Sequence, residues 1–179
     1  MYTNLRFLLL ALALGACKVS PPHTAVRIPD EGTVMLVGTA SLDSLNTSPF
    51  ESWYAANSEA YHPEAEMVEQ LKPLLEDVQI TLLLGTWCKD SRREVPRFVK
   101  ILEVAGYNPE DVTVIAVDRD KTTPGQFEDG LELLQVPTFI FYRNSEELGR
   151  IVEFPVVDLE SDMLKILSGQ PYRHAYDWD

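Results

Sequence analysis

One cysteine in the body of the chain has neighbours that suit thiol chemistry. The 179-residue sequence contains two cysteines, Cys17 and Cys88. Cys88 follows the apolar run 78–84 and precedes a helical pattern over 92–105, so we expect it at the amino end of a helix. Unpaired backbone N–H groups, the helix dipole and the charge of Lys89 all favour the nucleophilic thiolate there. The sequence therefore predicts a reactive thiol at Cys88, with an inert, buried cysteine as the alternative.

Two short segments resemble the thioredoxin superfamily. The first is the run 87–91, Trp-Cys-Lys-Asp-Ser, with Pro96 nine residues after Trp87. The second is Val136-Pro137-Thr138, which is similar to the Ile-Pro-Thr of thioredoxins and precedes another apolar run. The resemblance covers residues 78–167. It implies a thioredoxin-like α/β fold, a cis proline at Pro137 facing Cys88, and a substrate groove formed by Trp87, Val136, Pro137 and Thr138.

Two departures from the thioredoxin pattern remove the resolving half of the dithiol chemistry. Ser91 stands where thioredoxins carry their second cysteine, and Leu82 stands where they carry a buried aspartate. A single thiol can attack a disulfide and form a mixed disulfide, but an outside thiol must then release the partner. The resemblance thus implies a monothiol site with Cys88 and Ser91 as its catalytic residues. Ser91 and Glu94 also fit a capping box, in which Ser91 caps the helix.

The amino-terminal residues resemble the leader of a bacterial lipoprotein. Arg6 precedes a short apolar run, and Leu14-Gly15-Ala16-Cys17 is similar to a lipobox. The resemblance implies that residues 1–16 are a lipoprotein signal peptide, that Cys17 carries lipid, and that the protein is held at a membrane of the cell envelope, facing the periplasm or the cell exterior. An ordinary cleaved signal and an uncleaved anchor are the alternatives. Residues 17–32 contain three prolines and predict a flexible tether.

Charge and composition exclude several classes of function. The chain has 28 acidic and 15 basic residues, a formal net charge of −13. Such a body gains nothing from phosphate counterion release, so nucleic acid is not an expected partner. His23, His62 and His174 are isolated in the sequence, and two cysteines alone cannot hold a zinc ion or an iron–sulfur cluster. We expect no metal and no cofactor.

The order of patterns predicts one α/β domain over residues 33–170, a central mixed sheet flanked by helices, with an amino-terminal helical extension. A helix is expected to start at Ser48 with Pro49 in its first turn, a second at Pro63 with Pro73 kinking or ending it, and Gly106 should close a third. The aromatic tail 171–179 is expected to dock on the body, with partner binding as the alternative. The remaining expected elements are strands over 33–39, 78–84, 112–117, 138–142 and 148–154, and helices over 92–105, 124–134 and 158–167.

Two functions follow from these observations. The first is an exported protein that performs monothiol thiol–disulfide exchange through Cys88 on thiols or disulfides of envelope proteins, with an external small thiol completing the reaction. Whether it turns over as an oxidoreductase is left open by the missing second cysteine. The second is a non-catalytic module that holds peptides or proteins in the groove between Trp87 and Pro137.

Overall fold

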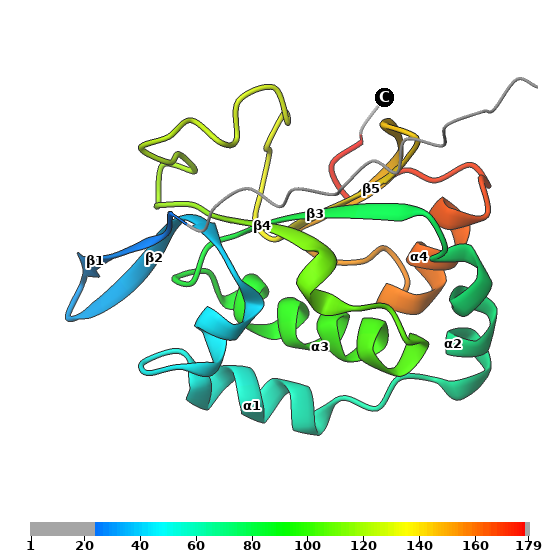
Figure 1. Cartoon of the computed structure of the whole chain (residues 1–179), viewed down its shortest axis with the longest axis horizontal. Coiled ribbons are helices and arrows are strands. Elements are labelled where there is room, and N and C mark those ends of the chain that lie inside the picture. Colours follow the sequence, from blue (N-terminus) through cyan, green and yellow to red (C-terminus); the bar gives the residue numbers. More distant parts are fainter. Residues whose placement is uncertain (1–23, 178–179) are drawn as a thin grey trace, which may run out of the picture.

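A computed structural model describes residues 24–177, which form a mixed α/β structure around a six-stranded sheet (Figure 1). The strand order is β1-β2-β4-β3-β5-β6. The strands are β1 (Val26–Asp30), β2 (Thr33–Ala40), β3 (Val78–Leu84), β4 (Val112–Ala116), β5 (Thr138–Arg143) and β6 (Glu146–Val152). The α-helices are α1 (Glu51–Ala60), α2 (Ala65–Leu71), α3 (Lys89–Ala105) and α4 (Leu159–Leu167), with 3-10 turns η1 (Leu42–Asn46), η2 (Lys72–Leu74) and η3 (Pro109–Asp111).

The central strands β3 and β4 are parallel and are joined through α3. A parallel pair needs such a crossover, whereas antiparallel neighbours can be joined by short turns. The pairs β1–β2, β2–β4, β3–β5 and β5–β6 are antiparallel. The predicted mixed sheet flanked by helices is therefore confirmed, and β5 and β6 form the predicted hairpin.

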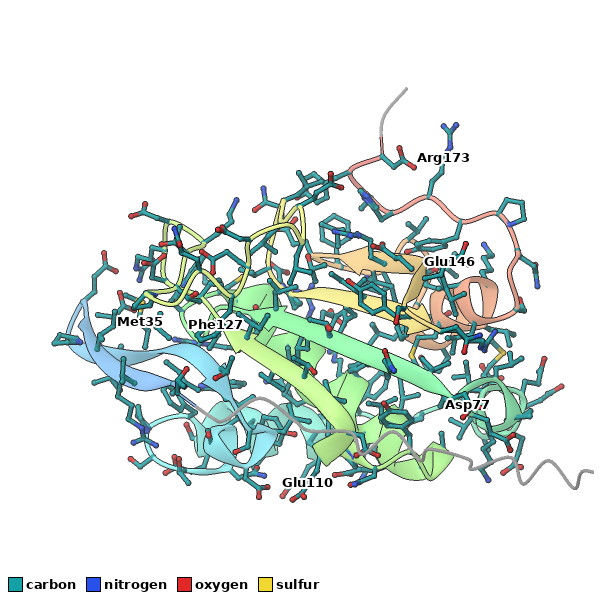
Figure 2. The ribbon with its side chains drawn as sticks, turned by 45° about the horizontal axis from the view of Figure 1, so that its top comes forward. Met35, Asp77, Glu110, Phe127, Glu146 and Arg173 are labelled. Carbon is teal, nitrogen blue, oxygen red and sulfur yellow. The ribbon has the colours of Figure 1, made fainter. Side chains whose placement is uncertain are left out.

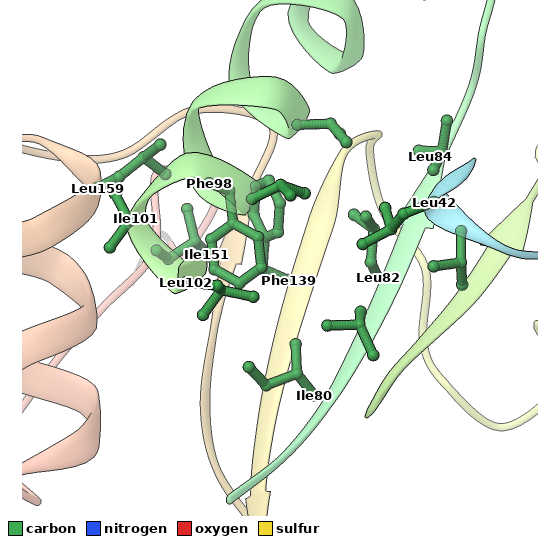
Figure 3. Close-up of a cluster of buried hydrophobic side chains, with 14 of the residues drawn as sticks. Leu42, Ile80, Leu82, Leu84, Phe98, Ile101, Leu102, Phe139, Ile151 and Leu159 are labelled. Carbon is green, nitrogen blue, oxygen red and sulfur yellow. The ribbon is translucent and has the colours of Figure 1, made fainter. Parts of the chain in front are cut away.

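The main hydrophobic core lies between the sheet and the four α-helices, which cover the same face (Figure 1). Alternate residues of β3, such as Leu82 and Leu84, point into this core, where Phe98 of α3 meets Phe139 of β5 with ring centroids 4.3 Å apart (Figure 3). Burying a side chain of this size stabilises the fold by about 1.5–3 kcal/mol. This packing fixes α3, and with it Cys88, against the sheet.

The opposite face of the sheet carries a smaller apolar cluster under the loop between β4 and β5. Leu83, Ile115 and Ile140 are buried there, and Trp87 and Cys88 pack against them. The predicted helix over 124–134 is wrong, because this segment is a series of turns. Positive φ angles at 126, 130 and 132 break any helical run. The Glu128 carboxylate accepts hydrogen bonds from the backbone N–H and the hydroxyl of Thr123 in the same loop. Figure 2 shows Phe127 on this loop.

The predicted tether over 17–32 is wrong for its last part. Val26–Asp30 is strand β1, which pairs with β2, and the backbone N–H groups of Thr24 and Ala25 donate to the Thr39 carbonyl. β1 is the edge of the sheet, where Pro29 is tolerated because its missing N–H faces no partner strand. The predicted signal peptide, Cys17 and the first residues of the tether lie outside the described residues.

The helical extension forms with shifted starts. α1 begins at Glu51 without a side-chain cap, so the predicted cap by Ser48 is wrong. The guanidinium of Arg27 instead holds the Ser48 carbonyl and, at 2.6 Å, the Thr47 hydroxyl. α2 begins at Ala65, two residues after Pro63. Pro73 ends it in a 3-10 turn, as expected.

Candidate functional site

Cys88 is the N-cap residue of α3, as the sequence predicts. β3 ends at Leu84, and a tight turn follows in which the Cys88 N–H donates to the Gly85 carbonyl at 2.9 Å. The backbone of Cys88 is extended, and its carbonyl accepts from Arg92 N–H at 3.1 Å, which starts the helix. The side chain is half-buried. Cys88 is therefore held at the positive end of a 17-residue helix.

The two segments that resemble thioredoxin meet in space. The Cys88 thiol donates to the carbonyl oxygen of Val136 at 3.2 Å. The Val136–Pro137 peptide bond is cis. Trp87, Cys88 and Val136 belong to the same apolar cluster. Sequence reasoning placed these residues in one site, and the structure brings them together.

The segment expected to form a substrate groove is covered in this structure. Val136 is 2% exposed and Thr138 is 1% exposed. The Thr138 hydroxyl donates to the Gln135 carbonyl at 2.6 Å, and the Pro137 carbonyl accepts from the Glu153 N–H at 2.7 Å. The Thr138 hydroxyl thus stabilises the turn before β5. The Pro137 carbonyl already accepts a hydrogen bond from the Glu153 N–H.

Ser91 lies inside α3 and is fully buried. Its hydroxyl oxygen accepts from the Gly85 N–H at 3.2 Å, so it ties the first turn of α3 to the end of β3. The capping-box interpretation of Ser91 and Glu94 is wrong, because Cys88 is the N-cap and Ser91 is the third helical residue. Glu94 is buried beside Arg93 and Arg97 instead.

Trp87 is fixed by two contacts and by its close approach to Gly85. Its indole N–H donates to the Val117 carbonyl at 3.0 Å, and the Arg119 guanidinium lies 5.5 Å from its ring centroid. Gly85 leaves room for the ring, since a Cβ atom there would lie 2.6 Å from Trp87 Cε2. Trp87 is therefore held rigidly next to Cys88.

Arg119 is a site residue that sequence reasoning missed. It donates to the buried carboxylate of Asp30 at 2.7 and 3.2 Å and to Glu31 at 3.1 Å. The hydrogen bond with Asp30 is the main cause of the raised pKa of the Arg119 guanidinium. The signal available in the sequence was its place just after the buried strand 112–117, where α/β proteins often put functional side chains.

The described part of the aromatic tail docks on the body, as expected. The Tyr172 hydroxyl donates to the buried carboxylate of Asp162 at 2.8 Å. Tyr176 packs on Phe154, with ring centroids 6.3 Å apart, and its hydroxyl hydrogen-bonds Glu153. That bond, partial burial and the charges of Glu153 and Asp90 raise the pKa of Tyr176 to about 12. The described tail therefore runs from α4 to the residues that follow β6.

Three further findings concern the rest of the described residues. Within residues 24–177 no group of acidic, histidine or cysteine side chains is arranged to hold a metal ion. None of the helices in that range is both long and apolar enough to cross a membrane. A surface pocket of about 410 Å³ lies between residues 39–43 and 109–114, at the end of β4 away from Trp87.

Comparisons with known proteins identify the fold alone. No protein-family model matches the chain, and no curated protein matches it. A protein of unknown function from Pseudomonas aeruginosa is similar in structure, with a TM-score of 0.56 and 15% identity, over 73% of this chain and 93% of that one. An HIV epitope scaffold is similar with a TM-score of 0.52 and 17% identity, over 74% of this chain and all of that one.

Proposed function

We propose that this chain is an exported, thioredoxin-like protein that performs monothiol thiol–disulfide exchange through Cys88. The order β3-α3-β4 followed by the β5–β6 hairpin and α4 supports a thioredoxin-like fold. The observation that carries the proposal is the contact at 3.2 Å between Cys88 Sγ and the carbonyl that precedes the cis proline. It joins a helix-terminal cysteine to the segment that, by the resemblance, binds substrate backbone.

The exchange begins when the Cys88 thiolate attacks one sulfur of a disulfide in an envelope protein. A Cys88–partner disulfide forms, the partner's own S–S bond breaks, and its second sulfur leaves as a thiolate that takes up a proton. Because Ser91 has no sulfur, a small external thiol attacks the mixed disulfide at the Cys88 sulfur and releases the partner. A second small thiol frees Cys88 and yields the oxidised small disulfide. The partner gains two electrons and two molecules of small thiol lose one each.

A binding module without turnover is the second candidate, and one observation favours it. The Cys88 thiol donates to the Val136 carbonyl, and that bond exists only while the sulfur keeps its proton. In that case the surface around Trp87 would hold a partner, and binding would survive the change Cys88→Ala.

Alkylation by iodoacetamide as a function of pH separates the two candidates. The full chain carrying Cys17→Ser leaves Cys88 as its remaining cysteine, and the double variant Cys17→Ser/Cys88→Ser serves as the blank. A midpoint well below the free-cysteine value of about 8.5 supports exchange. If Cys88 reacts only after the chain is unfolded, the result contradicts the exchange function, and the binding module is then the remaining candidate.

Attachment to the envelope through lipid on Cys17 is part of the same proposal. It is supported by the sequence Leu14-Gly15-Ala16-Cys17 after a short apolar run. Labelled palmitate supplied to expressing cells should enter the wild-type chain and not the Cys17→Ser variant. Equal labelling of both would contradict it.

A further inference from the structure

The carboxyl-terminal tail crosses from α4 to the part of the chain that covers Pro137. At its start, Tyr172 is tied to Asp162 of α4 at 2.8 Å. Four residues later, Tyr176 contacts both residues that follow β6: its hydroxyl bonds Glu153 and its ring packs on Phe154. The red end of the chain in Figure 1 follows this path above β5. Tyr176 thus holds the segment of Glu153 and Phe154.

That segment in turn closes the edge beside Cys88. The Glu153 N–H donates to the Pro137 carbonyl at 2.7 Å, and Glu153 itself has a positive φ of 64°. A glutamate in this left-handed conformation is uncommon and needs support from its surroundings. The bond to Tyr176 supplies such support from the tail. The chain of contacts therefore runs from Tyr176 through Glu153 to Pro137, whose neighbour Val136 contacts Cys88.

We propose that the tail is a latch: Tyr176 keeps the Glu153–Phe154 segment closed over Pro137, and a protein disulfide reaches Cys88 productively only when the tail has left. This inference rests on the proposed exchange function and adds its regulation.

The tail obstructs the approach of a protein partner to Cys88 because such a partner is large, but it does not obstruct a small reagent. A specific protein interface covers about 800 Å² on each partner, a disc about 16 Å in radius. A partner centred on Cys88 would therefore cover the first turn of α3 and the Glu153–Phe154 segment. Tyr176 is bound to Glu153 and packs on Phe154, so the tail occupies part of this area. A small disulfide, in contrast, needs access only to the Cys88 sulfur.

The contacts of the latch are weak enough to open. Between Tyr176 and the Glu153–Phe154 segment, the structure describes one hydrogen bond to a carboxylate and one aromatic pair at the surface, and Phe154 stays 40% exposed. Contacts of this kind favour the docked tail about tenfold to a hundredfold. Only the undocked fraction then reacts with a bulky partner, which lowers the observed rate by the same factor.

The test compares two disulfides of different size on the full chain carrying Cys17→Ser. The probes are dithiobis(nitrobenzoate), a small aromatic disulfide, and insulin, a disulfide-bonded protein. The variants are Tyr176→Phe, which keeps the ring and removes the hydroxyl, and a chain ending at Arg173, which keeps the Tyr172 anchor. Tyr107→Phe is the matched control, since it removes a phenol bond to the Val78 carbonyl at the far end of α3.

We expect the rate constant with insulin to rise at least about tenfold in the shortened chain and less in Tyr176→Phe, with the small disulfide changed less than about twofold. Tyr107→Phe should match the parent with both probes. Equal or slower reaction of the shortened chain with insulin would overturn the latch while leaving exchange intact. Lack of reaction with either disulfide in every variant would overturn the exchange function, and the latch with it.

Discussion

Cys88 Sγ lies 3.2 Å from the carbonyl oxygen of Val136, although 48 residues separate them in the chain. This contact fixes the thiol at the meeting point of α3 and the turn before β5. The thiol thus lies at the start of a helix and has a backbone carbonyl as its hydrogen-bond acceptor. Changes that move Trp87, Ser91 or the turn at Gly85 should therefore alter thiol chemistry as well as stability.

Ser91→Cys should convert the monothiol site into a dithiol site. The new sulfur would replace a buried hydroxyl three residues after Cys88, close enough to attack a mixed disulfide and release the partner. Insulin reduction in the presence of dithiothreitol should rise at least about tenfold. Ser91→Ala removes the same hydroxyl without adding a thiol and should show no such rise. Accumulation of mixed disulfide in Ser91→Cys would count against this geometry.

Gly85→Ala should displace the Trp87 ring. The added Cβ would meet Trp87 Cε2 at 2.6 Å and Nε1 at 2.8 Å, and the ring is anchored to Val117. We expect the free energy of unfolding in urea to fall by about 1–3 kcal/mol, as in other overpacked sites. In a Trp87→Phe background the smaller ring should reduce that loss. The same loss in both backgrounds would show that Trp87 is not the obstacle.

Arg119→Ala should loosen the β1–β2 hairpin from the site. Arg119 joins Asp30 at the end of β1 to the Trp87 ring, so its removal leaves a buried carboxylate without its guanidinium. Amide hydrogen exchange over residues 26–30 should become severalfold faster. Arg119→Lys keeps the charge but not the forked geometry of the guanidinium. Its amide exchange rates should therefore lie between those of the parent and those of Arg119→Ala. Unchanged exchange in Arg119→Ala would mean that backbone pairing alone holds β1.

Tyr61→Phe should destabilise the attachment of the helical extension. The Tyr61 hydroxyl donates to the buried Glu160 carboxylate at 2.6 Å, and the other oxygen of Glu160 accepts from Glu64 N–H at 3.3 Å. Removing a donor from a buried carboxylate costs about 1–3 kcal/mol. Urea unfolding measures this loss. Tyr107→Phe removes a bond to a neutral carbonyl and should cost less.

The same tyrosine should make stability fall at alkaline pH. Burial, followed by its hydrogen bond to Glu160, raises the pKa of Tyr61 above the ordinary value of 10. The unfolded chain therefore loses the Tyr61 proton at a lower pH than the folded chain does. The stabilisation that Tyr61 contributes is complete below about pH 10 and declines as the pH rises further. Burial also raises the pKa of Tyr107, to about 12. Between pH 9 and 11, the urea midpoint should fall less steeply in Tyr61→Phe than in the parent; parallel curves would contradict this.

Local patterns in the sequence determined most of the sheet and the place of Cys88. Apolar runs marked β3, β4 and β5, and helical periodicity ending at Gly106 marked α3, because these signals arise from neighbouring residues. The helix predicted over 124–134 is absent. Positive φ angles at residues 126, 130 and 132 and hydrogen bonds within the loop hold this segment in turns.

Only the tertiary structure decided what surrounds the thiol. The pairing of Arg119 with Asp30 joins residues 89 apart, and the Tyr176–Glu153 bond joins residues 23 apart. From the sequence, residues 26–30 are predicted to be part of the tether. They form strand β1 because all five of them pair with residues of β2. Such contacts depend on how distant segments pack together, and no local pattern of residues specifies that packing. Sequence thus determined which residue carries the sulfur, and tertiary packing determined which distant segments lie around it.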